Sequence, residues 1–149
     1  MRLQLIVILL LALMAAACGG SPSASRTVDD AAALIERGDF KGAHRKAEAV
    51  MADSAALNSL TVSQLCRLAV VFVRLSNQET PSETDANDAM AARCLSRARA
   101  VAPDSVAQFI GSLTGEMAGR IIVLDQVGTF LTTPRDSLTD TPDDSLSIN

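Results

Sequence analysis

Cysteine, histidine and paired carboxylates are the side chains of this chain that could carry out nucleophilic, metal or acid–base chemistry. The 149 residues contain three cysteines and a single histidine, His44. His44 is followed by Arg45 and Lys46, which are typical of a solvated helix face, and no partner stands at metal-ligand spacing. Phosphate-binding loops and nucleophile elbows are also missing from the sequence. We therefore expect no catalytic residues, no metal site and no cofactor, and we predict that the protein is not an enzyme.

Cys18 follows a segment with the pattern of a secretion signal. Arg2 supplies a positive start, an apolar run extends from Leu3 to Leu13, and Ala15-Ala16-Ala17 forms a small-residue cleavage site. A cysteine directly after such a site resembles the lipobox of bacterial lipoproteins, although Ala15 stands where that motif usually has leucine. The resemblance implies that residues 1–17 are a cleaved signal peptide and that the Cys18 thiol carries lipid such as palmitate. The alternatives are plain secretion and an uncleaved anchor, and the apolar stretch is shorter than the about 20 residues of a spanning helix.

Residues 18–26 form a linker rich in glycine and serine, which are typical of a flexible tether. In lipoproteins an aspartate after the lipidated cysteine favours retention in the inner membrane, and here that position is Gly19. The resemblance therefore implies a protein that is lipid-anchored to the outer membrane and faces the periplasm.

Cys66 and Cys94 remain as an even pair once Cys18 is lipidated, in a compartment where disulfides persist. A bridge between them would contribute about 3–4 kcal/mol in the chain-entropy model. The alternative is two separate buried thiols that behave as small apolar side chains. The sequence leaves both interpretations open.

Composition limits the kinds of partner. The net charge is −4, which gives no basis for binding nucleic acid. Tryptophan and tyrosine are missing and only four phenylalanines are present, so the aromatic platforms of sugar-binding and base-stacking sites are disfavoured. The length suits one small domain, which we place at residues 27–131.

Helices are the elements that must position these side chains, because apolar residues recur at helical spacing from Thr27 onward. The pattern predicts helices over residues 28–37, 40–51, 61–75 and 86–101. Gly38-Asp39 separates the first two, and an acidic segment over residues 76–88 connects the last two. The predicted fold class is all-α, with about five helices when a long C-terminal helix is included.

Two segments resemble the tetratricopeptide repeat. Gly38-Asp39-Phe40 with Ala43 is similar to the turn and second helix of that repeat. The next unit matches it at Leu65, Leu68, Ala69 and Phe72, and then at Ala91, Leu95, Ala98 and Pro103. The chain departs from the family at Leu65, which occupies the tryptophan position, and in the long 76–88 connection. The resemblance implies antiparallel helical hairpins that bind other proteins.

A long last helix is predicted over residues 106–131. Gly111, Gly115 and Gly119 are spaced four apart on one face together with Ala107. Three interior glycines cost about 3 kcal/mol of helix propensity relative to alanine, so we expect a compensating close contact. The alternatives are a neighbouring helix of the same domain, self-association of the chain, bilayer insertion, and a break of the helix at one of the glycines.

Residues 132–149 are rich in Thr, Ser, Asp and Pro and are predicted to be a disordered acidic tail. The second predicted hairpin is basic by contrast. Its arginines are Arg67, Arg74, Arg93, Arg97 and Arg99. They form either a solvated face or a surface that docks an acidic segment, from a partner or from this chain's own tail.

These observations predict a membrane-anchored envelope lipoprotein that acts as a protein–protein interaction scaffold or adaptor, with envelope proteins as its partners. The alternative is a self-assembling structural lipoprotein, a homo-oligomer that associates through Gly111, Gly115 and Gly119. A third hypothesis is a binding module for an apolar small ligand between the helices.

Overall fold

The computed structural model describes residues 23–78 and 81–132, and within these ranges all of the regular secondary structure is helical. This confirms the all-α prediction. The seven helices of the described part are α2 (Ala24–Glu36), α3 (Phe40–Ala52), α4 (Ser54–Ser59), α5 (Val62–Ser76), α6 (Pro81–Val101), α7 (Pro103–Ser112) and α8 (Gly115–Thr132). The signal peptide, Cys18 and residues 133–149 of the predicted tail lie outside the described residues.

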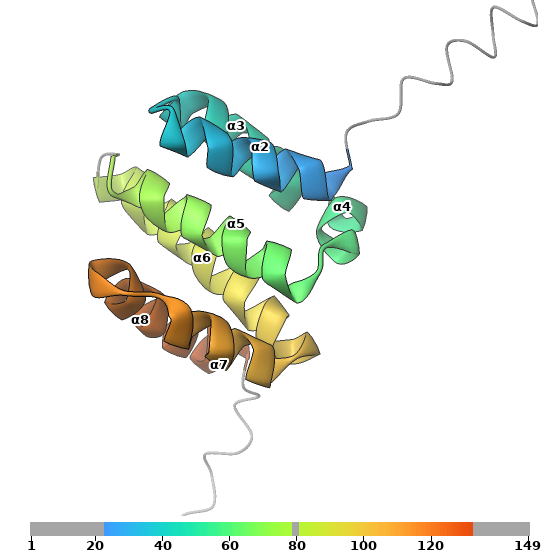
Figure 1. The fold of residues 1–149 in the computed structure, drawn as a ribbon, viewed down its shortest axis with the longest axis vertical. Helices are drawn as coiled ribbons and strands as arrows, with labels where there is room; N and C mark the ends of the chain where they lie inside the picture. Colours follow the sequence, from blue (N-terminus) through green and yellow to red (C-terminus); the bar gives the residue numbers. More distant parts are fainter. Residues whose placement is uncertain (1–22, 79–80, 133–149) are drawn as a thin grey trace, which may run out of the picture.

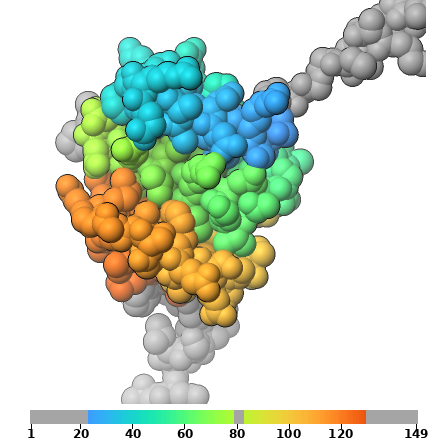
Figure 2. Space-filling model, in the orientation of Figure 1, coloured from blue at the N-terminus to red at the C-terminus, as the bar shows by residue number. Residues whose placement is uncertain are grey.

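The helices stack as three layers, each built from a pair of helices (Figure 1). The first layer is α2 with α3, the second α5 with α6, and the third α7 with α8. The middle layer contacts both of the others: α5 packs on α2 and α3, and α6 packs on α7 and α8. The same order is visible in the space-filling view, where the green residues of α5 lie between the blue residues of the first layer and the orange residues of the third (Figure 2).

Each helix of the first layer begins at a capping residue. Ser23 caps α2, because its hydroxyl oxygen accepts from the Arg26 N–H at 3.4 Å. The helix therefore begins four residues earlier than predicted, and residues 24–26 belong to it rather than to the linker. Gly38 follows the end of α2 with a positive φ of 78°. The Asp39 carboxylate then caps the start of α3. The predicted break at Gly38-Asp39 is confirmed.

The middle layer forms the centre of the core. Thr61 opens α5 with a capping box, in which the Thr61 hydroxyl and the Gln64 side chain each accept a main-chain N–H from the other residue. The face predicted for α5 is buried, and Phe72 at its centre has no exposed surface. The largest buried side chains here are Leu65, Leu68, Phe72, Leu75 and Leu95. Small alanines of α3, α5 and α6 are fully buried between them and permit the close approach of the helices.

This region differs from the prediction in one additional helix, α4, and in the earlier start of α6. The short helix α4 carries no apolar periodicity and is held by Asp53, whose carboxylate accepts from the N–H groups of Ala55 and Ala56 at 2.9 and 3.1 Å. Helix α6 begins at Pro81, so most of the expected 76–88 connection is helical. Proline suits a first helical position because the missing N–H has no partner there.

The third layer differs from the prediction, and the single helix over residues 106–131 is wrong. Gly115 has a φ of 64°, in the left-handed region, and the chain turns there into a second helix. Such a conformation costs other residues about 1–2 kcal/mol, so glycine is the residue that makes this turn inexpensive. Helix α6 ends at Val101, and Pro103 is the first residue of α7.

Candidate functional site

An open groove of about 810 Å³ lies between α7, α8 and the C-terminal half of α6. We call it the α7–α8 groove. Its lining residues are Arg99, Ala107, Ile110, Gly111, Ile122, Asp125, Gln126 and Thr129. The groove exists because Gly115 turns the chain, so that α7 and α8 form two walls where a single straight helix would have presented a convex surface. Concave sites with largely apolar walls are the usual form of a binding site.

An ion pair between α6 and α8 provides the polar part of this groove. Arg99 Nε donates to Asp125 Oδ1 at 2.8 Å, and Arg99 Nη2 donates to Asp125 Oδ2. The Asp125 side chain is only 8% exposed and that of Arg99 is 33% exposed. The hydrogen bond from Arg99 to Asp125 raises the pKa of Arg99 above its usual value. Because each charge is matched by the other in a two-pronged contact, the pair is suited to fixing α8 against α6 rather than to acid–base work.

The walls of the groove are largely apolar, and other apolar side chains are exposed elsewhere on α8. Ala107, Ile110 and Gly111 come from α7, and Ile122 comes from α8. Ile122 is 42% exposed. Val123 and Val127, which are 57% and 44% exposed, lie about 100° and 140° further around α8. A groove with largely apolar walls and an exposed aliphatic side chain in its lining is typical of a surface that another molecule covers.

The predicted glycine interface is divided between two helices. Ala107 and Gly111 lie on α7, whereas Gly115 and Gly119 begin and continue α8. A Cβ atom built at Gly111, Gly115 or Gly119 would meet nothing within 4 Å. No helix in the described part of the chain therefore packs on these glycines, which contradicts the interpretation that they serve internal packing.

The glycine that makes the close contact is Gly128, which the sequence analysis did not identify. A Cβ atom there would lie 2.7 Å from the Ala92 carbonyl oxygen and 3.3 Å from Ser96 Cβ. Gly128 is nine residues after Gly119, so the two lie on opposite faces of α8 at 100° per residue. Gly128 was visible in the sequence as a further glycine of the same predicted helix. Its neighbouring residues, however, do not indicate which face of that helix packs against α6.

Of the two interpretations of Cys66 and Cys94 that the sequence left open, the structure has buried free thiols. The Cys94 thiol donates to Met51 Sδ at 3.5 Å. Burial and the Asp125 carboxylate raise the pKa of Cys66 to about 11, and burial raises the pKa of Cys94 to about 12. Since the thiolate is the reactive form of cysteine, these residues behave as apolar core side chains.

His44 is placed on α3, where its Nε2 lies 3.4 Å from Glu48 Oε1. In residues 23–78 and 81–132, no group of three metal-ligating side chains comes together. Over the same ranges, none of the helices has both the length and the apolar composition needed to cross a bilayer.

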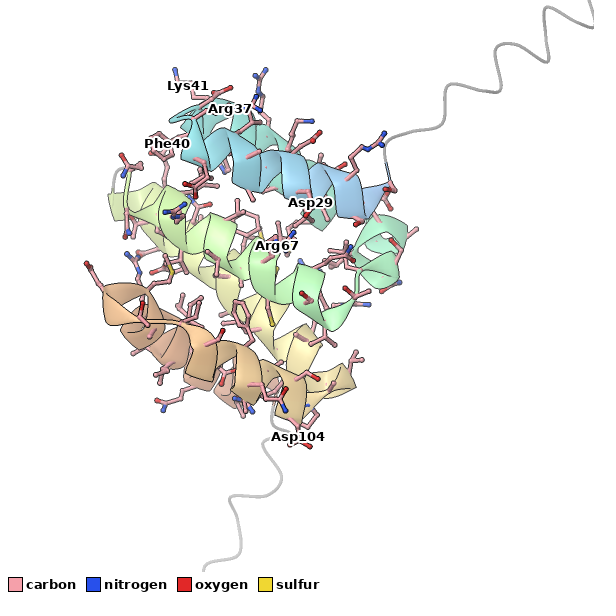
Figure 3. The ribbon with its side chains drawn as sticks, viewed as in Figure 1. Asp29, Arg37, Phe40, Lys41, Arg67 and Asp104 are labelled. Atoms are coloured by element: carbon pink, nitrogen blue, oxygen red, sulfur yellow. The ribbon has the colours of Figure 1, made fainter. Side chains whose placement is uncertain are left out.

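The predicted basic surface separates into two parts. Arg67 and Arg74 on α5 form ion pairs with acidic residues of α2, Asp29 and Glu36 respectively. Figure 3 shows Arg67 reaching across to Asp29 from the neighbouring layer. The remaining arginines, Arg93, Arg97 and Arg99, line a second groove of about 440 Å³ that also includes Ser96, Ala100, Pro103 and Thr129. We call this the arginine groove.

Comparison with known proteins returned no match for this chain. No family model matches the sequence, and no curated protein or solved structure is similar enough to it to count as a match.

Proposed function

We propose that this protein is a small lipoprotein of the bacterial envelope that acts as a protein–protein interaction scaffold or adaptor and catalyses no reaction. The observation that carries the proposal is the α7–α8 groove, with its largely apolar walls and the exposed Ile122 in its lining. Its one ion pair is internally satisfied, so the groove offers shape and apolar surface rather than a reactive group.

The stacked hairpins support a tetratricopeptide-like assignment. The residues that carry the resemblance in α5 and α6 face the buried interface of the middle layer. Proteins built from such hairpins typically bind other proteins on concave surfaces. The chain departs from a regular repeat in the extra helix α4. Because fold alone is weak evidence of function, the proposal rests on the α7–α8 groove more than on the repeat-like hairpins.

The position of the anchor supports the same function. Cys18 precedes the first described residue by five positions, and α2 belongs to the first layer. The α7–α8 groove belongs to the third layer, on the opposite side of the stack (Figure 1). A lipid on Cys18 would therefore hold the first layer near the outer membrane and leave the groove facing the periplasm.

The anchor is tested by replacing Cys18 with alanine. We expect the parent protein to fractionate with membranes and its mature N-terminal peptide to carry the mass of acyl chains on Cys18. The Cys18→Ala variant is expected in the soluble fraction or as an unprocessed precursor. Membrane association and processing unchanged by the substitution would refute the lipoprotein assignment.

The scaffold function is tested by photo-cross-linking in intact cells. A photoreactive residue at position 122 reports on the groove, and one at position 41 is the matched control, because Lys41 is exposed on the first layer (Figure 3). We expect one distinct protein to be captured at position 122 in near-equal amount, and not at position 41. Equal capture at both positions, or none at position 122, would contradict the proposal.

Self-association is the alternative function, and the open space at Gly111, Gly115 and Gly119 favours it. A second copy of the chain could approach the backbone closely at these residues, although they are divided between two helices. The suitable test is Gly119→Leu with sedimentation analysis, because leucine at Gly115 would be strained by the positive φ there. A smaller oligomer with unchanged helix content supports self-association, and cross-links only between copies of this chain would point the same way.

A further inference from the structure

The arginine groove has a surplus of positive charge. Asp125 neutralises Arg99, whereas Arg97 donates to the neutral Asn58 side chain. Within the described residues, no carboxylate forms an ion pair with Arg93 or Arg97. Both guanidinium groups lie on the exposed side of α6, one helical turn apart. The groove is therefore suited to a ligand with two or more negative charges.

The groove is adjacent to the point where an acidic segment of this chain begins. Thr129, one turn before the end of α8 at Thr132, is part of its lining. The sequence that follows contains Asp136, Asp140, Asp143 and Asp144, opposed only by Arg135. These aspartates come 4 to 12 residues after Thr132, which gives an extended chain a reach of about 13–40 Å.

We propose that the arginine groove binds the chain's own acidic segment, residues 133–149, through ion pairs of its aspartates with Arg93 and Arg97. The short connection to α8 supplies an effective concentration in the millimolar range, so contacts that would be weak between separate molecules suffice for occupancy. An acidic segment of another protein must then compete with this internal one for the groove. The inference is independent of the lipid anchor and of the α7–α8 groove.

The test is photo-cross-linking from position 138 in the purified protein, with the adducts mapped by mass spectrometry. A mixture of normal and isotope-labelled chains separates links within one chain from links between chains. We expect links within one chain to residues 93–103 at low salt, and few at high salt, where charges are screened over a few ångströms. The Arg93→Gln/Arg97→Gln variant is expected to lower their yield roughly fivefold. The control Arg37→Gln, at an exposed arginine of the first layer (Figure 3), is expected to leave the yield unchanged.

A second variant keeps the test independent of any effect of the arginines on folding. Asp143→Asn/Asp144→Asn changes no described residue, and we expect the same loss of links to residues 93–103. Links that are spread over the surface, or that resist both salt and these substitutions, would overturn the proposal. Links found only between different chains would also overturn it and would identify a second copy as the occupant.

Discussion

Replacing Gly128 with alanine tests whether the close contact between α6 and α8 holds the third layer to the rest of the fold. The added Cβ atom would lie 2.7 Å from the Ala92 carbonyl oxygen, closer than real Cβ atoms approach their neighbours. The obstacle is backbone, which has no rotamer to change, so the two helices must separate by a few tenths of an ångström. Dispersion contacts along the whole interface weaken as a result.

The size of the effect follows from two opposing contributions. Overpacking of a well-packed interface costs about 1–3 kcal/mol. Alanine also gains about 0.5–1 kcal/mol over glycine inside a helix. Gly119→Ala is the matched control, since it lies in the same helix and its Cβ atom would meet nothing within 4 Å. The gain in propensity is common to both variants, so the difference between them isolates the steric cost and is expected to be about 1–3 kcal/mol.

Urea unfolding followed by far-ultraviolet circular dichroism measures both variants against the parent. We expect Gly119→Ala to raise the unfolding midpoint and Gly128→Ala to lower it, with the denaturant slope unchanged in each case. If the two substitutions shift the midpoint equally, α6 and α8 do not approach each other as closely as the structure shows, and the account of the third layer is wrong.

Four further predictions concern the ion pair, the buried thiols and the capping of α5. Asp125→Asn removes the charge that Arg99 contacts and is expected to cost about 1–3 kcal/mol in urea unfolding, and an unchanged midpoint would show that the pair adds no stability. A thiol reagent at pH 8 is expected to label Cys66 and Cys94 only in the unfolded protein, because their pKa values of about 11 and 12 keep both thiols protonated in the fold. The unfolded thiols lose their protons near the usual pKa of 9.0, whereas the folded thiols keep them up to about pH 11–12. The free energy of unfolding should therefore be unaffected by the thiols below pH 9 and should fall as the pH rises from 9 to about 11–12. A Cys66→Ala variant is expected to lose less stability over this pH range. Thr61→Ala removes the capping box of α5 and is expected to lower the free energy of unfolding by about 1 kcal/mol, measured by thermal unfolding. The control is Ser59→Ala, an exposed serine whose hydroxyl does not cap the start of a helix.

Local signals in the sequence account for most of the helices. The apolar spacing around Leu65, Leu68 and Phe72 predicted the buried face of α5, because helical periodicity is a property of a few consecutive turns. The break at Gly38-Asp39 was equally predictable, since a glycine followed by a capping residue favours the end of one helix and the start of the next. The lipobox resemblance at Cys18 remains a prediction, as that residue lies outside the described part of the chain.

The errors arose where the outcome depends on distant residues. Gly111, Gly115 and Gly119 look alike in the sequence, but only Gly115 takes a positive φ, and neither of the others is covered by a helix. The spacing of Cys66 and Cys94 left both a disulfide and separate buried thiols open. The structure places Cys94 against Met51 instead, a contact between helices that are far apart in the sequence.

The sequence by itself determined the all-helical class, the first hairpins and the acidic and basic segments, because capping, periodicity and charge act over a few neighbouring residues. Only the tertiary structure decided the candidate site. The α7–α8 groove requires the turn at Gly115, the approach of Gly128 to Ala92 and the pairing of Asp125 with Arg99. Each of these depends on how α8 packs on α6, and that packing is the sum of many weak contacts between residues distant in the chain.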